Sequence, residues 1–291
     1  MELLVTLRKI ESLEKLLPMV DGIITGQSFT TGYKMSKDDL RKARAYCQTL
    51  NKKFYIVMDN FITEDERMIL LEYFSFIEEL NPDGIYFHDL GIIDAAKSSN
   101  MANRLIYDGK TVLCNSLDAA FMLKNNIESV VISRELTLKE VSDIVTNLMG
   151  RVEMQIFGHL RMSYSRRRFL TNYFREINKD YDYLGKETLK LVEEQRDYAM
   201  PIVEDENGTY IYTDFILEMF EEVVKLRPFL RRGIIDTLFI EDDNLIAQVC
   251  RDYKRIDENN KQFVREAFLH NYPGNYSKGY LYQKTNISKD G

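Results

Sequence analysis

Short apolar runs of the kind that form buried β-strands recur along this chain, and this recurrence is the feature that most limits its fold. The intervals between them carry apolar residues at helical spacing, as at Ile10, Leu13 and Leu17. Strands without polar alternation are typical of parallel sheets that helices cover on both faces. We expect strands at residues 3–6, 22–25, 54–58, 84–87, 105–107, 129–132, 152–156 and 237–240.

Eight such strands alternating with helices can close into a (β/α)8 barrel of the TIM type, which commonly needs about 250 residues. An open, doubly wound sheet is the alternative. The sequence lacks the Gly-x-Gly-x-x-Gly fingerprint of a dinucleotide-binding open sheet, and it contains no P-loop. We therefore predict an α/β barrel over residues 1–245 with an arginine-rich insertion at about 157–230, followed by a helical and loop-rich C-terminal extension at 246–291.

Composition indicates a globular protein, since 45% of the 291 residues are hydrophobic. The formal net charge of −7 gives no whole-chain attraction to nucleic acid or anionic membranes, so a polyanion would need a local basic patch. We expect no membrane span and no signal peptide, because no run approaches ~20 apolar residues. Three scattered cysteines indicate neither a disulfide framework nor a metal site, and a cytoplasmic location fits them best.

Polar side chains follow nearly every predicted strand, at the end of a barrel where chemistry takes place. Strand interiors exclude such groups, so their concentration at the strand ends predicts a polar funnel above an apolar core. Within this set, His88, Asp89, Glu153 and Glu241 are our candidate catalytic residues. The predicted pocket is lined by Gln27, Asp59, His88, Asp89, Arg134, Glu153, His159 and Glu241.

Several longer segments carry recognisable motifs. Residues 83–91 end in Asp-Leu-Gly, residues 130–138 contain Ser-Arg-Glu-Leu, and residues 153–168 contain Met-Ser-Tyr-Ser after Glu153. These segments resemble family 32 of the unclassified (U) peptidases, the collagenase-like group, and together with the others they cover most of the chain. Further segments similar to that family lie at 115–117, 201–212, 235–241 and 279–285.

One departure from the family pattern concerns cofactors. Many members carry cysteines flanking Met-Ser-Tyr-Ser, and some of them hold an iron–sulfur cluster with such cysteines. This sequence has Arg161 and Arg168 at those places, and guanidinium cannot replace the thiolate that a cluster requires. The resemblance is therefore to a short, cysteine-free branch, and it implies that this chain holds no such cofactor.

The same resemblance implies a function and partners. Members of the cysteine-free branch are linked to 5-hydroxylation of the wobble uridine of certain tRNAs, in a pathway that uses prephenate. They occur beside a longer, cysteine-bearing paralogue. The implied partners are therefore tRNA, that paralogue and a small carboxylate.

An arginine-rich stretch supplies the local basic patch that the whole-chain charge does not. Between residues 151 and 175 six arginines stand against one acid, Glu153, which gives a net charge of +5. Guanidinium groups bind phosphate through paired hydrogen bonds, and neighbouring aromatic rings can stack on a base. Four rings interleave with the later arginines of this stretch: Tyr164, Phe169, Tyr173 and Phe174.

We assign a second group of residues to substrate or RNA binding by combining this stretch with the strand ends. An alternative role for the arginines is to pair with acids inside the fold. Acids that can neutralise them lie farther along the chain, at residues 187, 193, 194, 221 and 222. A subunit contact is a third use, since arginine and tyrosine enrich interfaces. The assigned residues are Gln27, Asp59, Arg134, His159, Arg161, Tyr164, Arg166, Arg167 and Arg168.

A peptidase needs an activated nucleophile or a metal-bound water. The sequence has no His-Glu-x-x-His helix and no Gly-x-Ser-x-Gly elbow. Cys114 could act as a nucleophile with His88 or His159, although a buried, inert cysteine is the alternative. Three hypotheses stay open: a subunit of a tRNA hydroxylation system that binds a small carboxylate or nucleotide, a collagenase-like peptidase, and a non-catalytic partner of the cysteine-bearing paralogue.

Overall fold

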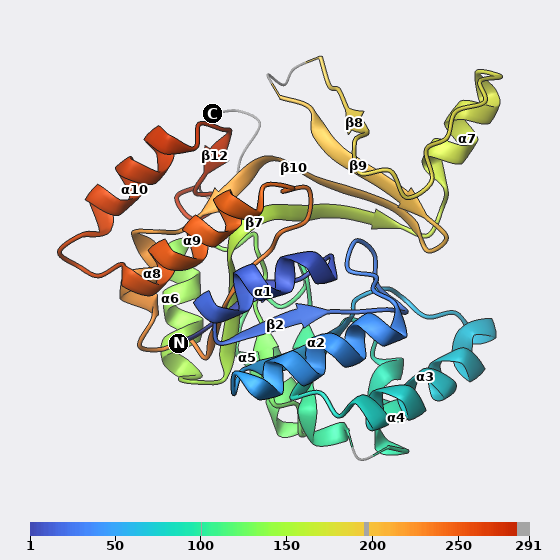
Figure 1. The fold of residues 1–291 in the computed structure, drawn as a ribbon, viewed down its shortest axis with the longest axis horizontal. Helices are drawn as coiled ribbons and strands as arrows, with labels where there is room; N and C mark the ends of the chain where they lie inside the picture. Colours follow the sequence, from blue (N-terminus) through green and yellow to red (C-terminus); the bar gives the residue numbers. More distant parts are fainter. Residues whose placement is uncertain (100, 195–197, 284–291) are drawn as a thin grey trace.

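A closed ring of parallel strands forms the centre of the computed structural model, which describes residues 1–99, 101–194 and 198–283 (Figure 1). Strands β1 (Glu2–Thr6) to β7 (Val152–Ser165) pair in chain order, and β11 (Arg232–Ile235) pairs with both β7 and β1. This double pairing closes the ring and confirms the predicted (β/α)8 barrel. The strands between are β2 (Gly22–Thr25), β3 (Lys53–Met58), β4 (Gly84–Phe87), β5 (Leu105–Asp108) and β6 (Ser129–Val131).

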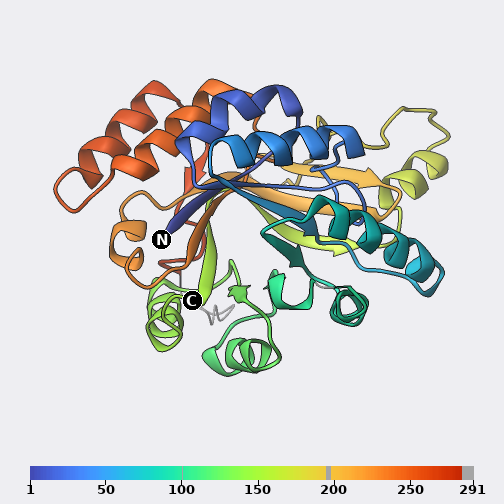
Figure 2. The ribbon, with the colours of Figure 1, turned by 60° about the horizontal axis from the view of Figure 1, so that its bottom comes forward.

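Helices surround the ring on its outer side (Figure 2). Their starts follow local sequence signals: the Ser36 side chain caps α2, and Thr137 with Glu140 forms a capping box at the start of α6. Each helix buries its apolar face against the strands. The helices around the barrel are α1 (Leu13–Leu16), α2 (Lys37–Thr49), α3 (Arg67–Leu80), α4 (Gly91–Lys97), α5 (Ser116–Lys124), α6 (Leu138–Asn147), α8 (Glu222–Leu226) and α9 (Asp243–Arg255).

The last barrel strand lies earlier in the chain than predicted. The expected strand at 237–240 is a loop, in which Phe239 has a φ of 65°. Strand β11 begins instead with Arg232, a charged residue that buried strands usually exclude. Its side chain is only 4% exposed, and ion pairs with Glu153 and Glu128 neutralise it inside the barrel. The loop after the last strand therefore starts at Asp236, well before Glu241.

Strand β7 is 14 residues long, and its second half extends beyond the barrel and carries the insertion. Strand β10 (Gly208–Glu218) pairs antiparallel with this half, and β9 (Met200–Asp205) pairs with β10 through a hairpin at Asn207-Gly208. We call residues 166–191 the arm. It contains α7 (Phe169–Glu176) and β8 (Lys190–Leu191), and α7 protrudes from the body at the upper right of Figure 1.

The β9–β10 hairpin covers the carboxyl end of the barrel. Its residues Val203, Tyr210 and Tyr212 are buried in the same cluster as Leu4 and Ile24 from the barrel interior. Asp205 in β9 also pairs with Lys34, which follows β2. The mouth of the barrel is therefore enclosed between the strand ends and the hairpin.

The C-terminal segment completes the ring of helices. Helix α9 spans the expected boundary at residue 245 and packs on α1 and β1, so it belongs structurally to the barrel. Helix α10 (Lys261–Asn271) and β12 (Tyr276–Ser277) follow, and β12 pairs with β10. The predicted extension to residue 291, and the end of the matching segment at 279–285, lie partly outside the described residues. Within the described part of the chain, no helix is long and apolar enough to cross a membrane.

Candidate binding site at the barrel mouth

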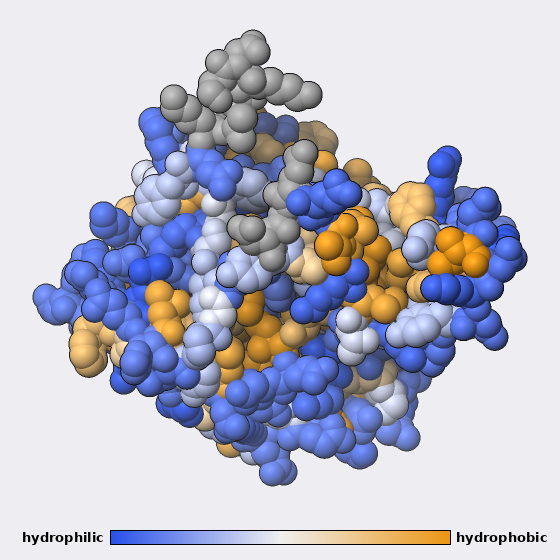
Figure 3. All heavy atoms as spheres, turned by 90° about the horizontal axis from the view of Figure 1, so that it is seen from above, coloured by the Kyte–Doolittle hydropathy of each residue, from blue (hydrophilic) through white to orange (hydrophobic). Residues whose placement is uncertain are grey.

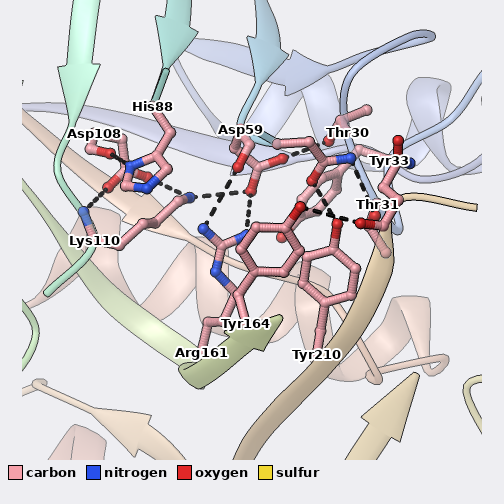
Figure 4. Close-up of polar contacts among 12 residues, drawn as sticks. Thr30, Thr31, Tyr33, Asp59, His88, Asp108, Lys110, Arg161, Tyr164 and Tyr210 are labelled. Carbon is pink, nitrogen blue, oxygen red and sulfur yellow. Dashed lines mark hydrogen bonds and ion pairs between the residues drawn. The ribbon is translucent and has the colours of Figure 1, made fainter. Parts of the chain in front are cut away.

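Asp59 is one of two buried aspartates at the centre of the mouth (Figure 4). It follows β3, and its Oδ2 lies 3.1 Å from Arg161 Nη1 and 3.1 Å from Lys110 Nζ. Thr30 donates a hydrogen bond to its Oδ1 at 2.8 Å. Burial opposes the charge of Asp59, but Lys110 and then Arg161 outweigh this effect and hold its pKa below the ordinary value.

Asp108, at the end of β5, is the second buried aspartate. Arg134 donates to it through Nη1 and Nη2, each at 3.1 Å, which is the paired geometry that guanidinium and carboxylate prefer. Lys110 Nζ donates to its Oδ2 at 2.6 Å and so bridges Asp108 and Asp59. Arg134 and Lys110 overcome the effect of burial and hold the pKa of Asp108 well below the ordinary value.

These five side chains carry one net positive charge, because three cations face two carboxylates. A third carboxylate, Asp236, lies nearby after β11 and is held by neutral donors. The Tyr33 hydroxyl donates to its two oxygens at 2.7 and 2.8 Å, and the Leu238 N–H donates at 3.0 Å. Hydrogen bonds to the carboxylate satisfy Asp236, which leaves the cations shared between Asp59 and Asp108.

His88 follows β4 and presents an uncharged imidazole to this group. Its Nδ1 lies 2.9 Å from the backbone oxygen of Asp108, and because a carbonyl only accepts, Nδ1 carries the hydrogen. Nε2 therefore keeps a free lone pair. Burial, and then the charge of Lys110, lowers the pKa of His88. At neutral pH this nitrogen can accept a hydrogen bond or a proton.

A column of aromatic rings holds Arg161 in place. Phe61 stacks on Tyr164 with centroids 5.4 Å apart, and Tyr164 stacks on Tyr210 at 4.6 Å. The Arg161 guanidinium lies 5.7 Å from the centroids of both tyrosine rings. The other end of the column meets His88, whose ring centroid is 4.8 Å from that of Phe61. Tyr164 thus contributes to the mouth rather than to the outer surface.

His159 lies where β7 leaves the barrel and connects indirectly to the same group. Its Nδ1 donates to the Thr213 carbonyl at 2.8 Å, and burial lowers its pKa. Gln155 bridges it to Arg134, since Arg134 Nε donates to Gln155 Oε1 at 2.7 Å and Gln155 Nε2 donates to the His159 carbonyl at 3.0 Å. The structure therefore brings together Asp59, His88, Arg134, His159, Arg161 and Tyr164 from the predicted set.

The four candidate catalytic residues do not converge. Glu153 is near the start of β7 and lies inside the barrel at its amino end, where its partners are Arg232 and Ser129, the first residues of their strands. Its expected place in the mouth is wrong, because that position needs the carboxyl end of a strand. Glu241 is exposed and lines a separate hollow of about 290 Å³ beside Arg8.

Two further predicted pocket residues lie at the edge of the site. Asp89 accepts hydrogen bonds from the backbone N–H groups of Ile62 and Gly91, so it braces the loop after β3 and the start of α4. Gln27 lines a groove of about 490 Å³ with Glu66 and borders the hairpin rather than the buried ion pairs. The mouth is therefore narrower than the predicted funnel.

Sequence reasoning missed several residues of the mouth. Asp108 ends β5 and Lys110 follows it. Asp108 belongs to the polar residues at the strand ends, but the predicted pocket left out both residues. Asp236 was missed because the last strand was placed too late. Tyr210 comes from the insertion, and no local pattern indicates that its hairpin folds over the barrel.

Arg161 occupies the place where an iron–sulfur cluster would need a cysteine ligand. Its guanidinium fills its position with an ion pair to buried Asp59, and of the cysteines Cys47 and Cys250 are buried whereas Cys114 is exposed. These residues do not fit an iron–sulfur cluster, which needs converging thiolates. Among the described residues, no group of three or more His, Cys, Asp or Glu side chains is placed to hold a metal ion.

Comparison with known proteins identifies the family. The sequence profile of Peptidase family U32 matches residues 29–289. The chain belongs to this family. A solved structure of a U32 peptidase covers 81% of the chain and 92% of its own length, with a TM-score of 0.51 and 11% identity. At that identity the likeness shows the fold alone, and it agrees with the barrel described above.

Curated relatives of this U32 family member include tRNA hydroxylation protein P2 of Bacillus subtilis (strain 168). It is 28% identical over 197 residues, which cover 66% of the chain and 64% of that protein. An uncharacterized protease of Methanocaldococcus jannaschii is 27% identical over 199 residues, which cover 66% of the chain and 48% of that protein. The chain thus spans less than two thirds of the length of these relatives.

Proposed function

We propose that this U32 family member is a subunit of a cytoplasmic system that 5-hydroxylates the wobble uridine of tRNA, and that its mouth binds a small carboxylate such as prephenate. The convergence of Lys110, Arg134 and Arg161 in an enclosed site carries this proposal. Two relatives, named tRNA hydroxylation proteins P2 and P, support the RNA-linked role.

Buried guanidinium groups suit a carboxylate ligand. Arg161 has five N–H donors and directs Nη1 and Nη2 towards Asp59, so hydrogen-bonding capacity remains for a second acceptor. Charge-assisted hydrogen bonds are strong in a site from which water is excluded. His88 adds an uncharged acceptor, Nε2, for a hydroxyl or an imide N–H of a bound molecule.

We assign this chain a binding role beside a cysteine-bearing paralogue. Arg161 stands where such paralogues carry a cysteine, and its guanidinium is committed to Asp59. The chain can therefore hold and orient a carboxylate or a uridine, while thiolate chemistry belongs to the partner. The alternative hypothesis, a non-catalytic partner of the paralogue, differs from this proposal because it assigns no ligand to the mouth.

The test uses a strain that lacks this gene and mass spectrometry of its bulk tRNA nucleosides. Rescue with Arg134→Lys, which keeps the charge but loses the paired hydrogen bonds to Asp108, should leave 5-hydroxyuridine about tenfold or more below wild type. Rescue with Arg232→Lys is the matched control. It alters an equally buried arginine at the opposite end of the barrel and should restore the modification.

Unchanged 5-hydroxyuridine in the deletion strain would refute the proposal.

The peptidase hypothesis makes a different prediction. The thiol of Cys114 is exposed and lies 3.1 Å from the carbonyl oxygen of Thr111, which is a backbone acceptor and not a catalytic base. Cleavage of denatured collagen by the purified protein, abolished by Cys114→Ala, would establish the peptidase instead.

A further inference from the structure

We propose that the exposed face of α7 and the turn before it bind a single-stranded segment of tRNA, through the arginines at 167, 168 and 175 and the rings of Phe169 and Tyr173. This inference rests on the proposed function and assigns its RNA contact to one surface. It differs from the sequence-based assignment, which placed Arg161 and Tyr164 on that surface, because both are enclosed in the mouth.

The aromatic residues of the arm differ in how far neighbouring rings cover them, and Tyr173 meets Phe174 only at its edge, with centroids 5.3 Å apart. Phe174 is stacked between Tyr181 and Tyr183, with centroids 5.3 and 5.0 Å away. Phe169 and Tyr173, four residues apart on one helical face, are 48% and 57% exposed. Tyrosine and phenylalanine rings exposed in this way can stack on unpaired bases.

The charges on this surface favour a polyanion. Arg167, Arg168, Arg175 and Lys179 are exposed. The exposed acids near them are residues 176, 180, 182 and 206, of which residue 182 pairs with Lys186 and residue 206 with Lys34. The arm is therefore locally basic in a chain whose net charge is −7. Electrostatic attraction to phosphate depends on such local patches.

Three of the five acids expected to neutralise these arginines are engaged elsewhere. Glu187 pairs with Arg8 on the barrel, and residues 221 and 222 pair with Lys278 near the C-terminus. Among the described residues, the first arginine of the run forms an ion pair, since Arg166 lies 3.4 Å from Glu66. Arg168 makes one contact, at 3.5 Å, with a backbone oxygen. The remaining guanidinium donors face solvent.

A buried carboxylate fixes the orientation of α7. Glu204, in β9, accepts hydrogen bonds from the N–H groups of Leu170 and Thr171 at 2.7 and 3.1 Å, and from the Thr209 hydroxyl at 2.7 Å. Negative charge at a helix N-terminus is stabilising, so this contact caps the helix and ties it to the hairpin. The exposed face is thus held in place before any ligand arrives, which lowers the entropic cost of binding.

The base of the arm adjoins the mouth. Arg166 donates to the Phe61 carbonyl at 3.0 Å, and the Phe61 ring lies against Tyr164 and His88. Figure 3 shows the upper face, with apolar side chains near the end of the arm set among hydrophilic ones. RNA lying along α7 would therefore place a neighbouring nucleotide beside the mouth.

The first experiment measures the affinity of the full-length protein for an in vitro transcribed tRNA with a wobble uridine, as a function of salt. Arg167→Gln combined with Arg175→Gln should weaken binding and reduce the slope of log affinity against log salt by about 1.4, at about 0.7 per lost phosphate contact. Lys139→Gln combined with Arg251→Gln, on α6 and α9, removes the same charge and should leave both quantities unchanged.

A second pair of variants tests stacking. Tyr173→Ala should weaken tRNA binding about fivefold or more, whereas Tyr173→Phe, which keeps the ring, should bind as wild type does. Both changes lie on an exposed face, so circular dichroism should show the same fold for each.

Equal affinities of the arm and control variants, or no binding of tRNA by the wild type, would overturn this inference. Loss of a co-purifying protein from the arm variants, with tRNA affinity unchanged, would assign the surface to a protein partner instead. Failure of the proposed function is distinguishable, because it appears as unchanged 5-hydroxyuridine in the deletion strain whatever the arm binds.

Discussion

Lys110 adopts a backbone conformation that is uncommon for lysine, with a φ of 55°, and this turn brings its ammonium between Asp59 and Asp108. A positive φ at a residue with a side chain persists where surrounding contacts stabilise it. Here two buried ion pairs do so. Burial, and then the charge of the same ammonium, lowers the pKa of His88, so the protonation of His88 depends on Lys110.

The lowered pKa of His88 makes a prediction about pH. Because its folded pKa lies below the unfolded value of about 6.5, protonation favours the unfolded chain. Its contribution to stability is therefore present above pH 6.5 and lost as the pH falls through the folded pKa. We expect NMR titration of the imidazole C–H signal of His88 to give a pKa below 6.5.

The chain has three histidines, which makes this measurement tractable. His88→Gln and His159→Gln assign the signals. A Lys110→Met variant should raise the pKa of His88 towards its ordinary value, because it removes a neighbouring positive charge. A titration of His88 at or above pH 6.5 in the wild type would contradict the geometry of the mouth.

Gly158 marks the point where β7 changes from barrel wall to support of the insertion. It has a φ of 115°, and a Cβ placed there would lie 2.3 Å from the Asp236 carbonyl oxygen. Only glycine allows this conformation and this approach together. The close contact lets β7 pass β11 and lead Arg161 over the barrel mouth.

Gly158→Ala should therefore destabilise the protein more than a glycine substitution that causes backbone strain without a steric clash. Gly150 provides the control, since its φ is 71° and an added Cβ would meet nothing within 4 Å. We expect Gly150→Ala to cost about 1 kcal/mol and Gly158→Ala about 3 kcal/mol or more in urea unfolding. Equal losses for the two variants would contradict the close approach of β7 to Asp236.

Across the whole molecule, α9 is the helix that completes the barrel. It buries Ile246, Val249 and Tyr253, and its first residue, Asp243, accepts a hydrogen bond from Ser12 at 2.7 Å. A chain that ends at residue 242 should not unfold cooperatively, because the outer face of β1 and β11 would be exposed.

A chain that ends at residue 272 is the matched control. It keeps the ring of helices but loses Lys278, which pairs with the buried Glu218 and Glu222. We expect it to fold with a lower midpoint in thermal circular dichroism, since Glu218 keeps Arg265 but the buried Glu222 loses its lysine partner. Cooperative unfolding of the shorter chain would show that the barrel ends before α9.

The barrel was predictable from sequence because most of its strands are largely apolar, and Asp59, His88 and Arg134 followed from their positions after strands. The last strand was misplaced because a buried ion pair allows Arg232 to begin it, and the pairing is visible only in three dimensions. For the same reason the position of Glu153 at the amino end of the barrel was not predicted, although its motif was recognised.

The convergence of distant segments could not be predicted from local patterns. Tyr210 and Lys110 are a hundred residues apart, and both reach the mouth only because the hairpin folds back over the strand ends. Nor does periodicity distinguish Phe174, which is stacked between two tyrosines, from Tyr173, which meets the edge of Phe174 and stays 57% exposed. Sequence indicated which residue types matter, and tertiary packing decided which of them are accessible.

Strand β7 also limits how this protein can change over evolutionary time. Gln155, Arg161 and Tyr164 lie on one uninterrupted strand that continues into the arm. Successive residues of β7 point to opposite sides except where its pairing shifts register, at Ile156 and Met162, so inserting or deleting one residue would turn the later side chains away from their present neighbours. Between residues 152 and 165, homologues with the same mouth should therefore differ by substitution and not by length.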